Sequence, residues 1–371
     1  MNTGFQEIFG TIKDPRIDRT KLHQMLDIIA LSIMGIMAGA QNFEEIEDFG
    51  RMHEGWLRRY LELKNGIPSH DTINRVFQII NPHEFHSAFL EWLTRIKPLL
   101  PETVIPIDGK TLRGSHQRSK GLKGLHVVSA WSCANGISLG HLKVEDKSNE
   151  ITALPEILKQ LTLAGAIVTI DAMGCQKGIV TQIHEGQADY VIGLKGNQGT
   201  LYENVRDCFD LKDPEYPLYS VTDDIGCEHG RIEERTLEVL DAHVLEGLID
   251  VSEWRGLKSI AKMTYTRETQ GKTTVQTLYY ISSLSPEHPY KLLRAIRSHW
   301  RIESMHWSLD VTFREDECRV RDETTALNLS LLRKMSLSLL KNEPSFNASI
   351  RRKQLKVWAN PHYLLKIFKA I

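Results

Sequence analysis

The sequence lacks the cysteine pattern of a disulfide scaffold or of a thiolate zinc site. Its 371 residues include five cysteines, which are widely scattered and never spaced as Cys-x-x-Cys. Small secreted domains and zinc ribbons place their cysteines at short, regular intervals. The sequence therefore predicts a reducing compartment, and the lack of a basic and then apolar N-terminal leader predicts the cytoplasm.

Long hydrophobic runs are also missing. The most apolar stretch, Ile28 to Ala40, has 13 residues, whereas a helix needs about 20 residues to cross a bilayer. We therefore expect a buried helix here and no membrane partner. The apolar fraction of 41% is ordinary for a folded chain, which excludes a disordered or collagen-like protein. At roughly 100–200 residues per domain, the length predicts two or three domains.

The chain as a whole has no excess of positive charge, since its net charge is −1. Proteins that bind nucleic acids are usually basic, so the total alone argues against such a partner. However, residues 331–371 carry nine basic residues and one acid, a net charge of +8 that leaves −9 for the rest. This stretch is either a solvated helical surface or a track for the DNA backbone, and a phosphate-cutting site elsewhere would favour the track.

The first hundred residues show the hydrophobic spacing of helices, with apolar residues recurring every three or four positions. Ser69 or Asp71 is placed to cap a helix that runs to Ile80, and Pro82 starts another after the break. The pattern predicts an all-helical N-terminal domain over residues 1–100. Its helix after Ser69 is one candidate for DNA recognition.

Short β-like runs follow, and helical segments separate some of them. The runs are residues 104–107, 126–131, 137–144, 166–170 and 190–194, with helical segments at 151–163 and 175–185. The order β-β-β-α-β-α-β predicts a mixed α/β sheet covered by helices. A polar region at 199–286 contains alternating runs typical of a β-rich insertion, and a helical pattern returns at Pro289. These features predict a second domain over residues 101–340 and a basic C-terminal tail at 341–371.

Two apolar strands of this region each end in an aspartate. Asp108 follows Val104–Ile107, and Asp171 follows Ile167–Ile170. Ligands of α/β sheets gather at the carboxyl ends of strands, and two carboxylates there favour a hard cation such as Mg²⁺ or Mn²⁺. An Asp-Gly turn and an Asp helix cap are the ordinary alternatives, and the pair leaves both interpretations open.

A third carboxylate lies on a predicted helix after the insertion. Glu303 has His299 and Trp307 one turn away on the same face. A helix that carries Glu303 toward the two strand ends would complete a two-metal site. The alternative is a surface glutamate that pairs with His299 or Arg297.

Several segments together resemble the H-repeat-associated insertion-sequence transposases, a branch of the Asp-Asp-Glu (DDE) transposases with a ribonuclease-H-like catalytic domain. The segments are Asp108-Gly-Lys-Thr-Leu-Arg-Gly-Ser, Asp171-Ala-Met-Gly-Cys-Gln, Tyr190-Val-Ile-Gly-Leu-Lys-Gly-Asn-Gln and His299-Trp-Arg-Ile-Glu303. Phe43-Glu-Glu-Ile-Glu-Asp-Phe-Gly and Gly66-Ile-Pro-Ser-His-Asp-Thr resemble the associated N-terminal domain of that family. The resemblance covers residues 5–340. It implies an α/β fold, a ribonuclease-H-like mixed sheet with flanking helices and a β-rich insertion, preceded by the helical domain.

The resemblance implies a DNA transposase that cuts phosphodiesters at transposon ends and joins the freed 3′-hydroxyl to target DNA. Two Mg²⁺ or Mn²⁺ ions held by Asp108, Asp171 and Glu303 would stabilise the entering and leaving oxygens. The implied partners are double-stranded DNA, as transposon ends and as target, and a second copy of the chain in the DNA complex. Two other functions stay open: a metal-dependent nuclease without strand transfer, and a DNA-binding relative whose catalysis has decayed or been repurposed.

The sequence departs from the wider family pattern around the glutamate, Tyr-x2-Arg-x3-Glu-x6-Lys. The positions of the Tyr, Arg and Lys hold Ile296, His299 and Asp310 here. The phosphate contacts usually made by those three residues therefore need other donors. The candidates for this role are Arg297, Arg301 and Arg314.

Further DNA contacts are expected near the strand ends and on the last helix. The residues are Lys110, Arg113, Lys195, Asn197, Trp254, Arg297, His299 and Arg301. For the first four residues, the alternative is a solvated loop. For Trp254, which could hold a flipped base, the alternative is a tryptophan packed in the interior. Basic residues continue from Lys110 to Lys123 without an acid. Pro106 removes a donor from the first strand, where we expect a small bulge.

Overall fold

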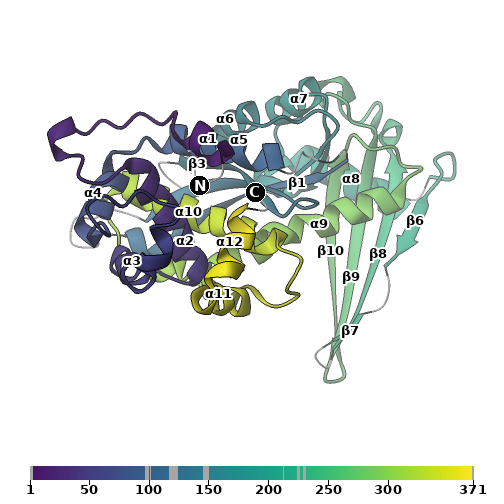
Figure 1. Ribbon diagram of the computed structural model, residues 1–371. Coiled ribbons are helices and arrows are strands. Elements are labelled where there is room, and N and C mark those ends of the chain that lie inside the picture. The colour runs from purple at the N-terminus through teal and green to yellow at the C-terminus, as the bar shows by residue number, and fades with distance from the viewer. Residues whose placement is uncertain are drawn as a thin grey trace. The chain divides into compact units, whose positions relative to one another are not determined.

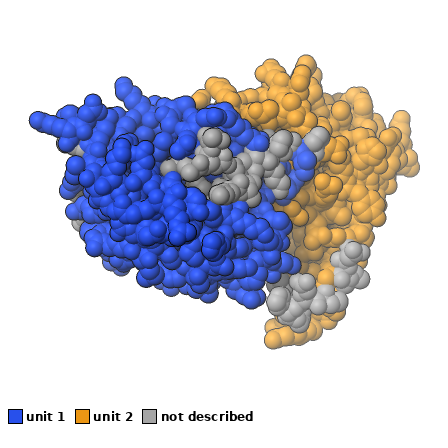
Figure 2. Space-filling model, in the orientation of Figure 1, with its two compact units in different colours: residues 1–100, 109–147, 303–371 blue, residues 101–108, 148–302 orange. Residues whose placement is uncertain are grey.

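The structure is a computed structural model that describes residues 3–96, 100, 102–116, 124–144, 150–211, 213–223, 226–228 and 231–369. The chain forms two compact units, coloured separately in Figure 2. The first unit contains residues 1–100, 109–147 and 303–371, and the second contains residues 101–108 and 148–302. The chain passes between them inside the strand β1 (Val104–Leu112) and inside the helix α9 (Pro289–Trp307).

The first unit is built mostly of helices (Figure 1). They are α1 (Thr3–Phe9), α2 (Met25–Ala38), α3 (Phe43–Leu57), α4 (His70–Ile79), α5 (Pro82–Ile96), α10 (Glu323–Asn342), α11 (Ile350–Ala359) and α12 (Pro361–Lys369). The predicted buried helix is confirmed, because every residue of α2 except Leu26 is buried. The Ser69 hydroxyl caps α4 by accepting a hydrogen bond from the Thr72 amide at 3.3 Å.

The helix α10 is the central element of the first unit. All of its residues from Thr325 to Leu340 are buried, and it packs against α2, α4, α5 and β3. The strands β2 (Leu125–Ser132) and β3 (Ile137–Val144) form an antiparallel hairpin. The second half of β1 lies beside β2, where the Thr111 hydroxyl and His126 Nδ1 are 2.9 Å apart.

No single helix in the described part of the chain is long and apolar enough to cross a membrane. The helices α2 and α3 reach that length and composition only when taken together, as a pair bent by 96°.

The second unit is a mixed α/β sheet, as predicted. Its strands follow the order β1-β4-β5-β10-β9-β8-β6, with β7 paired to β8. The first three are parallel, and the strands that follow are antiparallel. The bounds are β4 (Ile167–Ile170), β5 (Asp189–Leu194), β6 (Tyr219–Thr222), β7 (Gly226–Glu228), β8 (Arg231–Asp241), β9 (Ser259–Thr269) and β10 (Lys272–Ser282).

The remaining helices of this unit are α6 (Glu150–Gln160), α7 (Lys177–Glu185) and α8 (Gly199–Leu211). The region expected to be β-rich from residue 199 therefore begins with a helix, and the prediction was wrong for these thirteen residues. The reason lies in the spacing, since Leu201, Val205 and Phe209 are buried at helical intervals. The strands β8, β9 and β10 then supply the predicted sheet.

Pro106 lies in the regular part of β1. The register against β4 runs without a break from Val104 opposite Ile167 to Ile107 opposite Ile170, so the expected bulge is absent from this pairing. The Ile167 amide donates to the Thr103 carbonyl at 2.9 Å. Alternate residues after Thr103 face β4 in a parallel pair, so the nitrogen of Pro106 points away from that strand.

Candidate functional site

Asp108 and Asp171 occupy matching positions on neighbouring parallel strands in the second unit. β4 ends just before Asp171 as predicted, whereas β1 continues past Asp108 to Leu112, so the expectation that this strand ends at Asp108 was wrong. Ile107 lies opposite Ile170, the last pair in the register of β1 and β4, and each aspartate is the residue that follows in the chain. Asp108 is half-buried, and Asp171 is exposed. The parallel register therefore places the two predicted carboxylates side by side at the point where the pairing of β1 and β4 ends.

Asp171 also opens a short 3-10 turn, Ala172–Gly174. One carboxylate oxygen accepts a hydrogen bond from the Met173 amide at 3.0 Å, which is the helix-cap role considered as the alternative. A cap and a metal ligand are compatible, because an ionised carboxylate has about four acceptor sites. Gly193 of β5 packs against this turn, where an added Cβ would lie 3.1 Å from the Ala172 nitrogen.

His299 ties the helix α9 to the same strand end. Its Nδ1 shares a hydrogen bond of 3.0 Å with the Thr169 hydroxyl. Asp171 comes two residues after Thr169 in extended backbone. The two side chains therefore lie on the same face of the sheet. Burial lowers the pKa of His299, while the negative charge of Asp171 acts in the opposite direction. The imidazole is therefore neutral at pH 7 and feels the charge of Asp171.

Glu303 lies one helical turn after His299 on α9, and it begins the last segment of the first unit. The side chain is exposed, and partial burial raises the pKa of its carboxyl. The two residues considered as its partners are engaged elsewhere. His299 bonds Thr169, and Arg297 pairs with Asp223 Oδ2 at 2.7 Å.

The chemistry of these donors suits a hard divalent cation. Asp108 and Asp171 present carboxylate oxygens, which Mg²⁺ and Mn²⁺ prefer, with no thiolate in the pair. Within the described ranges, no three His, Cys, Asp or Glu side chains converge as a ready-made metal site. The two carboxylates of the second unit are thus oxygen donors of the kind that such a cation prefers, and they do not by themselves make a complete set of ligands.

Lys195 and Asn197 follow β5, the next strand of the sheet. Both side chains are exposed. The Asn197 amide donates to the Ala172 carbonyl at 2.7 Å, which links this loop to the turn after Asp171. Two of the residues expected to contact DNA thus lie beside the aspartates. Asn197 holds the turn, and Lys195 extends from the surface.

Two environments were considered for Lys110, a phosphate contact and a solvated loop. The structure shows neither of them. Its ammonium pairs with Asp310, and with Glu315 at 2.6 Å. The Lys110 side chain is 11% exposed. Arg113 is 81% exposed, with its Nε 3.5 Å from Asp316. Lys110 therefore neutralises acids inside the first unit, whereas Arg113 faces solvent.

The remaining predicted DNA contacts lie on the insertion and on α9. Trp254 is 4% exposed, which favours the packed interpretation. Arg297 and Arg301 are exposed. The basic residues at 118, 120 and 123 lie outside the described residues.

Part of the basic stretch at residues 331–371 is buried. Arg333 and Lys334 lie in α10, and Lys353 of α11 donates to the Leu340 carbonyl at 2.8 Å. These three charges are not available to a DNA backbone. The exposed basic residues are Lys341, Arg351, Arg352 and Lys366.

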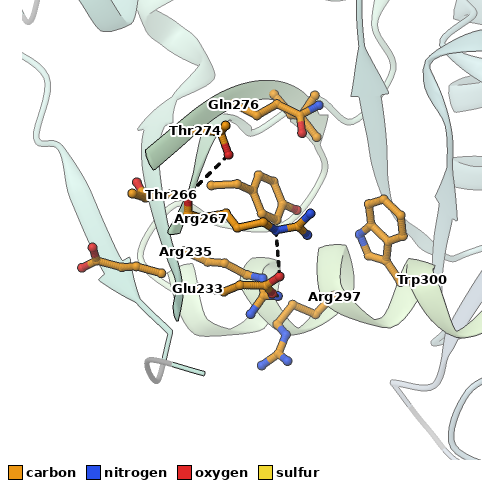
Figure 3. A pocket seen from close by; sticks show the side chains of 11 residues that line it. Glu233, Arg235, Thr266, Arg267, Thr274, Gln276, Arg297 and Trp300 are labelled. Atoms are coloured by element: carbon orange, nitrogen blue, oxygen red, sulfur yellow. Dashed lines mark hydrogen bonds and ion pairs between the residues drawn. The ribbon is translucent and has the colours of Figure 1, made fainter. Parts of the chain in front are cut away.

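The second unit contains a pocket of about 400 Å³ that was not predicted from the sequence (Figure 3). Trp300 and Arg297 of α9 line it together with residues of β8, β9 and β10. Arg267 Nε pairs with Glu233 at 2.9 Å, and Trp300 is 49% exposed. The only sequence signal was Trp300, which stands between His299 and Glu303, because the other residues come from distant segments.

Comparisons with known proteins cover most of the chain. A family described as "Transposase DDE domain" matches residues 100–339, and one described as "DDE_Tnp_1-associated" matches residues 6–93. The "H repeat-associated putative transposase YhhI" of Escherichia coli K12 is 39% identical over 356 residues, which are 93% of this chain and 92% of that protein. The "Putative transposase YncI" of Escherichia coli O157:H7 is 37% identical over 371 residues, 97% of this chain and 93% of that protein. The "Inactive transposase YbfQ" of strain K12 is 47% identical over 55 residues, 15% of this chain and 66% of that protein.

Proposed function

Since the chain belongs to the transposases with a DDE domain, we propose that it cuts DNA at the ends of an insertion sequence and joins those ends to target DNA. The observation that supports the proposal is the placement of Asp108 and Asp171 directly after the last paired residues of two neighbouring parallel strands. Glu303 is the third carboxylate. The parallel order β1-β4-β5, with the β2–β3 hairpin next to β1, supports a ribonuclease-H-like fold for the catalytic part.

The proposed cofactor is a pair of Mg²⁺ or Mn²⁺ ions, with Asp108, Asp171 and Glu303 as ligands. When bound, such ions neutralise the phosphate and stabilise the oxygens that enter and leave phosphorus. The Thr169–His299 hydrogen bond holds α9 at the end of β4, one helical turn before Glu303. The neutral His299 adds no positive charge that would compete with a cation for Asp171.

Double-stranded DNA is the proposed substrate, both as transposon end and as target. Exposed cations near the strand ends and on α9 would bind its phosphates, as a sequence-independent contribution to affinity. The residues are Arg113, Lys195, Arg297 and Arg301. A second copy of the chain is the proposed partner in the DNA complex, because two ends must be held together for joining.

We assign the functions to three parts of the chain. Residues 1–100 form the associated helical domain, residues 101–340 the catalytic domain with its insertion, and residues 341–371 the basic C-terminal part. The two compact units cut across this division, because the chain crosses between them beside Asp108 and Glu303.

The test is an assay for cleavage and strand transfer on DNA that carries the terminal inverted repeats, with Mg²⁺ or Mn²⁺. Asp108→Ala, Asp171→Ala and Glu303→Ala should each abolish cleavage while the fold is retained. Glu185→Ala, at an exposed acid that ends α7, is the matched control. Joined products would support a transposase. Cleavage without joining would support a nuclease, and DNA binding without cleavage would support a relative whose catalysis has decayed. A triad variant that still cut these ends would contradict the assignment.

A further inference from the structure

The outer part of β10, residues 272–278, has an open edge. β9 pairs with β10 along its whole length, whereas β5 pairs only with residues 279–282. Figure 1 shows β9 and β10 running side by side as long strands. In the part of the chain that the structure describes, no strand other than β9 pairs with β10 along residues 272–278. Residues 272–277 are all exposed.

The hairpin loop determines which backbone groups face this open edge. Gln270 and Gly271 have φ values of 52° and 73°, as in a type I′ loop, whose flanking residues exchange hydrogen bonds. Lys272 and every second residue after it therefore bond to β9. The amide and carbonyl groups of the intervening residues point outward from the open edge. These residues are Thr273, Val275 and Thr277.

An observed hydrogen bond supports this direction. Ser283 belongs to the same alternation as Val275, eight residues further along. Its amide donates to the Tyr190 carbonyl of β5 at 3.2 Å, on the side where β5 lies. The outward groups of the outer half of β10 thus face the place that β5 would occupy if it were longer.

We propose that a second copy of this chain pairs with the open edge, with the two β10 strands antiparallel about a two-fold axis at Val275. Val275 then lies opposite Val275 of the partner subunit, and Thr273 opposite Thr277 of the partner subunit. In this register, the three amide groups and three carbonyl groups that point outward from each edge all form hydrogen bonds. An isologous contact of this kind closes after two copies.

The composition of the edge fits strand addition. Thr273, Val275 and Thr277 are all β-branched, and Val275 is 66% exposed. Proteins usually protect a long edge strand with a proline, a bulge or inward charges. Residues 272–282 hold no proline, their register with β9 is unbroken, and Lys272 at the end is the only charge.

The charges around the edge favour a protein partner over DNA. The described charged side chains of the outer strands are Glu233, Glu234, Arg235, Arg267, Glu268 and Lys272, which sum to zero. Glu233 pairs with Arg267. A surface that tracks a phosphate backbone needs an excess of positive charge, and this one has none.

The small area of the contact determines the conditions under which two copies associate. One pair of seven-residue strands buries much less than the ~1,600 Å² of a standard stable interface. We therefore expect the contact to form when two copies are concentrated on the same DNA. The inference rests on the pairing of two copies in the proposed function, but its test needs no DNA cleavage.

Cysteine cross-linking tests the register. Opposite residues of a hydrogen-bonded antiparallel pair have Cα atoms about 5.5 Å apart, within the range of a disulfide. Val275→Cys, in a background with Cys133, Cys227 and Cys318 changed to Ser, should form a disulfide-linked dimer under mild oxidation. Thr274→Cys is the matched control, because Thr274 lies opposite Gln276 of the partner subunit and not opposite its own copy. We expect Val275→Cys to cross-link at least about tenfold faster, most clearly with DNA ends present.

A second variant separates this inference from the proposed function. Val275→Lys places two like charges on the axis, and it should reduce the pairing of two ends while cleavage of single ends stays within about twofold. Equal cross-linking of the two cysteine variants would overturn the inference, as would undiminished end pairing by Val275→Lys. Cross-linking without any cleavage would support the dimer and contradict the transposase.

Discussion

Lys110 forms an ion pair with Asp310, so a residue two positions after Asp108 is joined to one seven positions after Glu303. Asp310 lies in the π-helical turn Ser308–Thr312 that follows α9. In the wider family pattern a lysine stands at this position. Here the aspartate takes its place, and β1 supplies the lysine.

Loss of Lys110 should destabilise the first unit. Lys110→Met leaves the buried carboxylate of Glu315 without its closest cation, and an uncompensated buried charge costs about 3–5 kcal/mol. Arg113→Met, at an exposed cation three residues on, should cost less than about 0.5 kcal/mol. Urea unfolding measures both. Equal stability of the two variants would mean that the acids near Lys110 need no cation.

Lys334 should make stability depend on pH. The Lys334 ammonium is buried in α10, 2.7 Å from the Ser129 hydroxyl and 2.6 Å from His141 Nδ1. Burial lowers its pKa from 10.5 to about 7, although Glu315 acts in the opposite direction. The unfolded chain therefore binds one more proton between these values, and the free energy of unfolding should rise with pH from about 7 to 10.

The variant Lys334→Met removes this titration. The slope contributed by Lys334, at most about 1.4 kcal/mol per pH unit, should disappear. Lys341→Met, at an exposed lysine of the same helix, should keep the slope. Denaturant unfolding at pH 7, 8 and 9 makes the comparison. A slope that survives in Lys334→Met would assign the titration to another group.

Thr169 should matter for cleavage although it is no ligand. Thr169→Val removes the hydrogen bond that holds His299 and α9. A displacement of about 1 Å in a catalytic group can cost as much as 100-fold in rate, and we expect at least a tenfold loss in single-turnover cleavage. Thr181→Val, where the hydroxyl bonds only the Lys177 carbonyl of its own helix, is the control. An unchanged rate for Thr169→Val would remove the anchoring role from His299.

Gly193 should control the affinity for metal. In Gly193→Ala the new methyl group would lie 3.1 Å from the Ala172 nitrogen, so the turn after Asp171 must shift. We expect the Mg²⁺ concentration for half-maximal cleavage to rise several-fold. Gly199→Ala, which meets no atom within 4 Å, should leave it unchanged. The same Mg²⁺ dependence for both variants would show that the turn does not position Asp171.

The matching positions of Asp108 and Asp171 could be predicted from the sequence because their signal is local, although β1 continues past Asp108. Ile167–Ile170 is a short apolar run that ends in Asp171, and such a run is complete within a few residues. The cap at Ser69 was readable for the same reason. The helix α8 was missed because the polar composition of the insertion concealed a helical spacing of only three or four buried residues.

Contacts between distant segments could not be predicted. Lys110 and Asp310 are 200 residues apart, and no local pattern distinguishes a lysine that meets an acid from one that meets a phosphate. The same limit applies to α10, where Arg333 and Lys334 were counted as part of a basic surface. Their burial follows from the packing of α10 against α2 and β3, which the charge sum does not contain.

The exposed part of the basic tail should bind the DNA backbone. Arg351→Gln with Arg352→Gln removes two exposed charges of α11. Each phosphate contact contributes about 0.9 to the slope of log K against log salt, so the slope should fall by up to about 2. Arg206→Gln, at an exposed arginine that pairs with Asp207, should not change it. Binding titrations at several salt concentrations give the slopes. If both variants keep the wild-type slope, the tail is a solvated surface, and its charge has no part in DNA binding.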